Sequence, residues 1–127
     1  MTATAVCGLF DPRTRVMRWA RAGHLPPVLV RGGRPEAFPL IEGLLLGALP
    51  DVTYIEREVQ LEPDDTLLMF TDGLVERRDS SVEDSLGHLV SAAACGADDL
   101  DHRLDRLLAE SRSDTDDDTC VIGIQVG

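Results

Sequence analysis

The stretch that decides the fold is "MFTDGLVERRD", residues 69–79 of a 127-residue chain. A polar turn at residues 64–66 and an apolar run at residues 67–70 precede Thr71 and Asp72. A short apolar run bounded by turn residues is typical of a buried strand. A carboxylate at the mouth of such a strand is partly desolvated, so Asp72 needs hydrogen-bond donors, a cationic partner or a metal ion.

Composition limits the classes of protein to which the chain can belong. The length suits one domain, and an apolar content of 43% is enough for a core. The chain has 23 acidic and 12 basic residues and a net charge of −11. Because contacts to phosphate groups need clustered Lys and Arg, we expect no nucleic-acid partner.

Cysteine usage and hydropathy indicate the compartment. The three cysteines, Cys7, Cys95 and Cys120, are far apart in the sequence and form no Cys-x-x-Cys motif. We therefore expect a reduced, cytoplasmic protein in which Cys7 and Cys120 are core residues of strands. No apolar stretch approaches the roughly 20 residues that a membrane-spanning helix needs, so we expect no membrane span.

Hydrophobic periodicity predicts many strands, then two helices, then a last strand, which is an α+β order. The expected strands are residues 4–10, 16–21, 28–31, 54–61, 67–71 and 119–126, and the expected helices are residues 82–93 and 100–108. Residues 39–53 are expected to form a long irregular loop. We expect the last strand to pair with the strand at 67–71, which would bring Asp72 and the acidic run 116–118 to the same end of a sheet.

Two interpretations of these carboxylates follow from the residues alone. Carboxylates that converge from separate strand ends are the oxygen ligands that Mg²⁺ and Mn²⁺ prefer. Alternatively, the acidic run is a solvated loop and Asp72 caps a turn through its own backbone.

Several motifs, spread over nearly the whole chain, occur in the same order as in a known protein family. The motifs are Thr4-Ala5-Val6 with Asp11-Pro12, Trp19 to Pro27, Leu45-Leu46-Gly47, Leu61 to Asp65, Phe70 to Glu76, and Asp116 to Thr119. Together they resemble the C-terminal half of the SpoIIE/RsbU-like branch of the PPM-type metal-dependent serine/threonine phosphatases. The resemblance implies a PPM-phosphatase-like β-sandwich with flanking helices, of which residues 1–127 form a partial domain.

The resemblance also assigns roles to residues. Asp72, in the Thr-Asp-Gly motif, and Asp116, which opens the final acidic motif, match the family's ligands for Mn²⁺ or Mg²⁺. Supporting roles fall to Thr71, Gly73, Asp117 and His24. The third position of the final motif is usually apolar, and Asp118 occupies it here, which leaves the register of the motif open by one residue.

Two motifs of the family's N-terminal half have no match in this chain, a Gly-Asp motif and an Asp-x-x-Gly-His-Gly motif. These motifs complete the two-metal site, so we expect weak metal binding and little activity from this chain alone. Either a longer gene product supplies the missing half, or the site has degenerated. Half of a β-sandwich would also leave sheet edges and an apolar face uncovered, so we expect self-association.

The function that the resemblance implies is hydrolysis of phosphoserine or phosphothreonine by a metal-activated water. The expected substrate is a phosphorylated anti-sigma-factor antagonist of the STAS type, in bacterial partner-switching regulation. One alternative is a non-catalytic interaction module derived from a phosphatase domain, and another is a folding unit without an independent role.

Other residues have less specific interpretations. His24 could be a catalytic acid, although a structural role in its loop is favoured. Trp19 is expected to pack on the first hairpin, His88 and His102 to lie on the surface, and Glu76 with Arg77 and Arg78 to form a solvated face.

Overall fold

A computed structural model describes residues 3–44, 46–71, 84, 87, 89–91, 99–109 and 120–127. The chain divides into two compact units. The first comprises Met1–Pro26 and Pro39–Pro63, and the second comprises Pro27–Phe38 and Asp64–Gly127. None of the helices in the described part of the chain has both the length and the apolar character that a membrane span would need.

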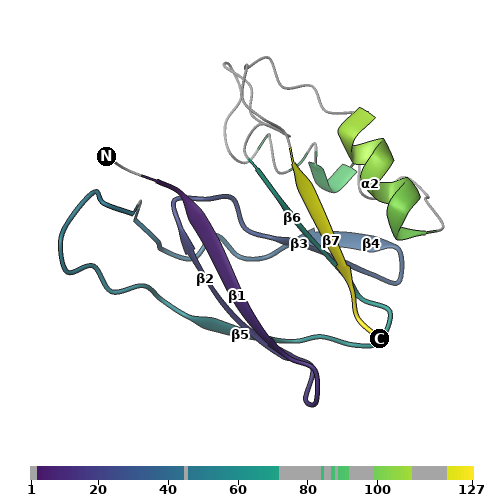
Figure 1. Cartoon of the computed structure of the whole chain (residues 1–127), viewed down its shortest axis with the longest axis horizontal. Coiled ribbons are helices and arrows are strands. Elements are labelled where there is room, and N and C mark those ends of the chain that lie inside the picture. The colour runs from purple at the N-terminus through teal and green to yellow at the C-terminus, as the bar shows by residue number, and fades with distance from the viewer. Residues whose placement is uncertain are drawn as a thin grey trace. The chain divides into compact units, whose positions relative to one another are not determined.

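The first unit is built on a three-stranded antiparallel sheet in the order β1-β2-β5 (Figure 1). Its strands are β1 (Ala5–Asp11), β2 (Val16–Ala22) and β5 (Arg57–Gln60). The hairpin of β1 and β2 confirms the prediction for the first two strands. β5 is shorter than the predicted strand at 54–61, because the pairing with β2 extends only from Trp19 opposite Arg57 to Val16 opposite Gln60.

Side-chain and backbone bonds close the turn between β1 and β2. The Arg13 N–H donates to Asp11 Oδ1 at 2.9 Å, and the Arg15 N–H donates to the Asp11 carbonyl at 2.7 Å. Arg15 has a φ of 59°, an uncommon left-handed conformation for a residue with a side chain. The Gln60 amide donates to the Thr14 carbonyl at 2.9 Å, which ties the turn to β5.

The buried face of this sheet is centred on Met17 and Trp19, which are 4% and 3% exposed. Gly8 lies opposite Trp19 in the register, and a Cβ there would collide with the Met17 side chain. The small residue on β1 therefore makes room for large residues on β2. The prediction that Trp19 is a packing residue of the hairpin is confirmed.

The second unit contains a four-stranded antiparallel sheet in the order β4-β3-β6-β7. Its strands are β3 (Val28–Arg31), β4 (Arg34–Ala37), β6 (Thr66–Phe70) and β7 (Val121–Gln125). β6 is central and mostly buried, as its continuous apolar run predicts. β7 pairs with β6 from Phe70 opposite Val121 to Thr66 opposite Gln125, which confirms the predicted neighbour of the last strand.

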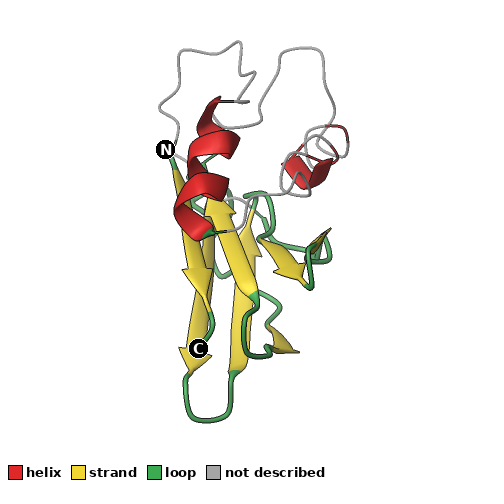
Figure 2. Cartoon of the chain, turned by 90° about the vertical axis from the view of Figure 1, so that its right-hand side faces the viewer, coloured by secondary structure: helices red, strands yellow, loops and turns green. Residues whose placement is uncertain are grey.

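Helix α2 (Leu100–Ala109) packs against β7 (Figure 2). Gly123 of β7 permits this contact, because a Cβ there would lie 2.6 Å from Leu100 Cδ1 and 3.2 Å from Leu104 Cδ2. Leu107 is buried. The predicted helix at 82–93 lies largely outside the described residues, although residues 84, 87 and 89–91 are helical.

An ion pair between the exposed Arg31 side chain and the buried Asp65 carboxylate joins β3 to the start of β6. Asp65 is 2% exposed, and its carboxylate accepts bonds from Arg31 Nε at 3.0 Å and from Arg31 Nη2 at 2.7 Å. The backbone of the same turn holds the C-terminal end, since the Asp64 N–H donates to the Val126 carbonyl and the Val126 N–H donates to the Asp65 carbonyl, each at 2.8 Å.

The structure corrects three details of the predicted core. Cys7 and Cys120 are exposed, so the prediction that they are core residues is wrong. Cys7 lies on β1, which has a neighbouring strand on one side only among the described residues, and Cys120 directly precedes β7. The spacing of Leu100, Leu104, Leu107 and Leu108 predicts one apolar face on the helix at 100–108. Leu108 is nevertheless 43% exposed, because the helix faces β7 through Leu100 and Leu104.

Candidate functional site

Thr71 and Cys120 join the chain where β6 ends and β7 begins. The Thr71 N–H donates to the Cys120 carbonyl at 3.0 Å, and the Cys120 N–H donates to Thr71 Oγ1 at 2.9 Å. Thr71 Oγ1 also lies 3.4 Å from the Cys120 carbonyl oxygen. These contacts continue the ladder that ends with Phe70 opposite Val121, so both strand termini are fixed at one end of the sheet.

The predicted metal ligands flank this pair in the sequence. Asp72 follows Thr71 directly, and Asp116 precedes Cys120 by four residues. Both ligands, and the supporting residues Gly73 and Asp117, lie outside the described residues. The described part of the chain contains no cluster of three or more His, Cys, Asp or Glu side chains that could hold a metal ion.

His24 belongs to the first unit, whereas Thr71 belongs to the second. The loop of His24 is held by its backbone: Arg21 Nε donates to the His24 carbonyl at 2.7 Å, and Arg21 Nη1 donates to the Ile41 carbonyl. The Gly23 N–H, at a φ of 67°, donates to the Gly43 carbonyl at 2.7 Å. The His24 ring contacts the Thr4 hydroxyl at 3.2 Å. These contacts favour a structural role for His24, which stays a prediction.

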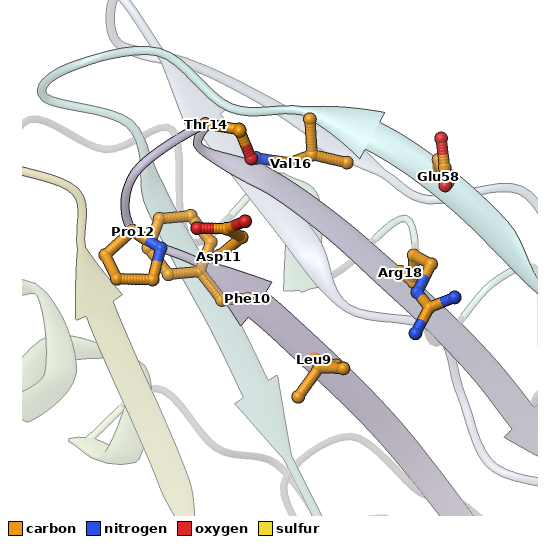
Figure 3. Close-up of a pocket in the computed structure, with 8 residues that line it drawn as sticks. All are labelled: Leu9, Phe10, Asp11, Pro12, Thr14, Val16, Arg18 and Glu58. Atoms are coloured by element: carbon orange, nitrogen blue, oxygen red, sulfur yellow. The ribbon is translucent and has the colours of Figure 1, made fainter.

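The first unit also carries an open hollow of about 700 Å³ beside the β1–β2 turn (Figure 3). Its walls are Leu9, Phe10, Asp11, Pro12, Thr14, Val16, Arg18 and Glu58. The register aligns Leu9, Arg18 and Glu58 across the three strands of the sheet. The hollow contains neither His nor Cys. Apart from Asp11 and Pro12, its members belong to none of the sequence motifs, because they come from separate parts of the hairpin and from β5.

The N-terminus of α2 has a charged cap. Asp99 Oδ1 accepts from the His102 N–H and Asp99 Oδ2 contacts His102 Nδ1, each at 2.8 Å. The hydrogen bonds from the His102 backbone and ring hold the pKa of the Asp99 carboxyl below its usual value. The hydrogen bond to Asp99 and its charge raise the pKa of the exposed His102 ring. The predicted surface position of His102 is confirmed.

A comparison with a family model identifies the family of the chain. The model of stage II sporulation protein E (SpoIIE) matches residues 1–127. The chain belongs to the SpoIIE family. No protein of curated function matches its sequence.

Solved structures of SpoIIE-like and related phosphatases resemble this chain. The RsbU and RsbW domains of Rv1364c from Mycobacterium tuberculosis match at 25% identity and a TM-score of 0.82, over 96% of this chain and 35% of that chain. The phosphatase domain of SpoIIE from Bacillus subtilis matches at 20% identity and a TM-score of 0.73, over 97% and 58%. The PPM Ser-Thr phosphatase MsPP from Mycobacterium smegmatis, in complex with cacodylate, matches at 21% identity and 0.64, over 98% and 61%.

These likenesses confirm the predicted α+β, PPM-phosphatase-like fold and the relationship to the SpoIIE/RsbU-like branch of the PPM phosphatases. The chain of this SpoIIE family member spans between 35% and 61% of the lengths of these three solved chains.

Proposed function

We propose that this chain carries part of the active site of a metal-dependent phosphoprotein phosphatase, in which Asp72 and Asp116 hold Mn²⁺ or Mg²⁺. The observation that carries the proposal is the pairing of Thr71 with Cys120, in a chain of the SpoIIE family. This pairing holds together Thr71, which directly precedes Asp72, and Cys120, which follows Asp116 by four residues. The SpoIIE phosphatase domain of B. subtilis, to which the chain is similar, was also solved in a Mn-presoaked form.

The donor chemistry fits such a cation. Mn²⁺ and Mg²⁺ prefer carboxylate oxygens and keep several water ligands, and the two acidic segments offer carboxylates. A bound divalent cation supplies Lewis acidity, since it lowers the pKa of a water and neutralises charge on a phosphate ester. The role of Thr71 is to keep the ends of β6 and β7 together, so that two mutually repelling carboxylates can serve one site. Asp117 and Gly73 support the two segments.

The proposed substrate is a phosphorylated STAS-type anti-sigma-factor antagonist in bacterial partner-switching regulation, in the cytoplasm. The likeness to a structure that contains an RsbU domain together with an RsbW domain supports this context. We propose that residues 1–127 form a partial phosphatase domain, so that the metal site and the turnover of the isolated chain are weak.

A dephosphorylation assay tests the proposal. The purified chain is incubated with a STAS domain phosphorylated on serine, with Mn²⁺ or with EDTA. We expect slow release of phosphate that needs Mn²⁺ and that Asp72→Asn abolishes, whereas Asp99→Asn at the cap of α2 leaves it unchanged. Binding of the STAS domain without any release of phosphate would contradict the proposal and favour the non-catalytic interaction module. Rapid turnover would contradict the expectation of an incomplete site.

A further inference from the structure

Strand β1 lies at an edge of its sheet and has the properties of an edge that pairs with a further strand. Among the described residues, β1 has β2 on one side and no strand on the other. Its seven residues follow those of β2 one to one, and the four consecutive residues 7–10 are all exposed. Leu9 is 64% exposed and Phe10 is 37% exposed. A regular, apolar and exposed edge of this kind is a template for strand addition.

The other edge strands of the two sheets are better protected. Folded proteins commonly block the edges of their sheets with charged side chains or proline. β5 carries Arg57 and Glu58, and β4 carries Arg34 and Pro35, whereas β1 has neither proline nor a charged side chain before Asp11. β7 is uncharged too, but it has only five residues and α2 packs against it. β1 is therefore the longest unprotected edge in the described part of the chain.

Charge indicates which strand fits this edge. A net charge of −11 makes two copies of the chain repel each other, so a contact between copies needs an uncharged surface. Residues 1–10 contain no charged side chain. Antiparallel pairing of two β1 strands places the two copies of Asp11, the one acidic residue of the strand, at opposite ends of the contact. A second copy of β1 therefore meets the edge without opposing like charges.

Strand geometry selects one register for such a pair. Alternate residues of a strand direct their backbone groups to the same edge, so an odd-numbered residue of β1 lies opposite an odd one and an even-numbered residue opposite an even one. The register centred on Gly8 is the one that pairs all seven residues. Val6 then lies opposite Phe10 of the second copy, and on the other face Cys7 lies opposite Leu9 of the second copy. Apolar pairs of this kind stabilise an antiparallel sheet.

We infer that β1 is a dimerisation edge, at which it pairs antiparallel with β1 of a second copy of this chain. The contact is symmetric, so the same strand serves both copies and the two sheets become one continuous sheet across the dimer. The inference does not depend on the proposed phosphatase function, because no residue of β1 is a proposed metal ligand. It gives the expected self-association a defined surface and register.

Sedimentation velocity over a range of concentrations measures the dimer of the full chain. We expect an equilibrium of monomer and dimer, with a dissociation constant about tenfold higher in Leu9→Lys, because a lysine blocks an edge strand. Leu108→Lys is the matched control, since Leu108 is 43% exposed on α2 and the variant makes the same change in net charge. This control should leave the dissociation constant unchanged.

Disulfide cross-linking tests the register. In a Cys95→Ser/Cys120→Ser background, Leu9→Cys places a thiol opposite Cys7 of the second copy, where the Cβ atoms of facing residues are about 5 Å apart. We expect mild oxidation to give a disulfide-linked dimer on a non-reducing gel. Phe10→Cys in the same background places the thiol on the other face of the strand and should give far less of this dimer.

Amide hydrogen exchange tests the edge without any variant. The N–H groups of alternate residues of β1 that face the edge become bonded only in the dimer. We therefore expect their exchange to slow as the protein concentration rises, whereas exchange at the residues between them should change less.

Five results would overturn the inference. Three of them are a monomer at every concentration, equal losses of the dimer in Leu9→Lys and Leu108→Lys, and equal cross-linking by Leu9→Cys and Phe10→Cys. The fourth is a dimer that Ile124→Lys removes and Leu9→Lys retains, which would assign the contact to β7. The fifth is slow exchange in β1 that persists on dilution to the monomer, which would assign the edge to another segment of the same chain.

Discussion

The hydroxyl of Thr71 accepts a hydrogen bond from the backbone N–H of Cys120 at 2.9 Å, directly before Asp72 in the sequence. The strand pairing alone would join these two residues through one backbone bond from Thr71 to the Cys120 carbonyl. The side chain adds the second link. Thr71 therefore ties the end of β6 to the residue that precedes β7 through both its backbone and its side chain.

Thr71→Val should loosen this connection with little change in shape. The variant removes the hydroxyl that accepts from the Cys120 N–H, so we expect a loss of about 1 kcal/mol in the free energy of unfolding. Amide exchange at Cys120 should become faster. Thr71→Ser keeps the hydroxyl and is the matched control. Unchanged exchange at Cys120 in the valine variant would show that the side chain does not hold the strand ends.

The ion pair between Arg31 and the buried Asp65 carboxylate predicts which of two variants is less stable. Arg31→Met leaves the carboxylate of Asp65 charged, with its bidentate partner removed, and should cost about 3 kcal/mol of unfolding free energy. Asp65→Asn keeps an acceptor for Arg31 and removes the buried charge, so it should cost less, about 2 kcal/mol. Urea unfolding monitored by far-UV circular dichroism measures both values, because the pair lies in the second unit and Trp19 lies in the first. A larger loss in Asp65→Asn than in Arg31→Met would contradict this account of the pair.

Asp64 has a φ of 71°, which glycine adopts without strain. Asp64→Gly keeps the N–H that bonds to Val126 and should raise the unfolding free energy by about 0.5 kcal/mol. Gly32→Ala is the opposite test, because its φ is +57° and no atom lies within 4 Å of the added Cβ. A loss of about 1 kcal/mol there isolates the backbone strain. The account fails if both variants change stability in the same direction.

The cap of α2 makes the helix sensitive to pH. The pKa of His102 is raised, so its stabilising charge is fully present below 6.5, the value of an unperturbed His, and is lost as the pH rises through the raised pKa. The pKa of Asp99 is lowered, so its contribution is present above 3.8 and is lost as the pH falls through the lowered pKa. We therefore expect both contributions to be present together between pH 3.8 and 6.5.

NMR titration of the His102 ring checks this pH dependence. Its midpoint should lie above 6.5 in the wild-type chain and should fall in Asp99→Asn, which keeps a capping acceptor but removes the charge. His102→Gln identifies the resonance among the three histidines of the chain. A midpoint that Asp99→Asn leaves in place would show that the carboxylate does not set the pKa.

The sequence predicted the elements that have strong local patterns. Local rules predicted the apolar run of β6 and the leucine spacing of α2. The order of the elements predicted that β6 and β7 are neighbours. Exposure was harder to predict, because it depends on which strands neighbour each residue. Cys7 and Cys120 have small apolar side chains that suit a core, yet their positions at an edge strand and before β7 expose them.

The candidate site was likewise predicted only in part. The motif pattern pointed to Thr71 and Asp72, but the hydrogen bond between Thr71 and Cys120 depends on a pairing of residues 49 apart in the sequence. The expected self-association stays a prediction; the exposure of Ile122 and Ile124 on β7 supplies apolar surface for it.

The most direct test of the proposed metal site is a Mn²⁺ titration of the purified chain, followed by the EPR signal of free Mn²⁺. The account predicts weak binding that Asp72→Asn and Asp116→Asn each remove, and that Asp99→Asn on α2 retains. Loss of binding in both ligand variants, with the cap variant unchanged, would place the cation at the ends of β6 and β7. The absence of Mn²⁺ binding by the wild-type chain, or equal binding by all of the variants, would contradict the account.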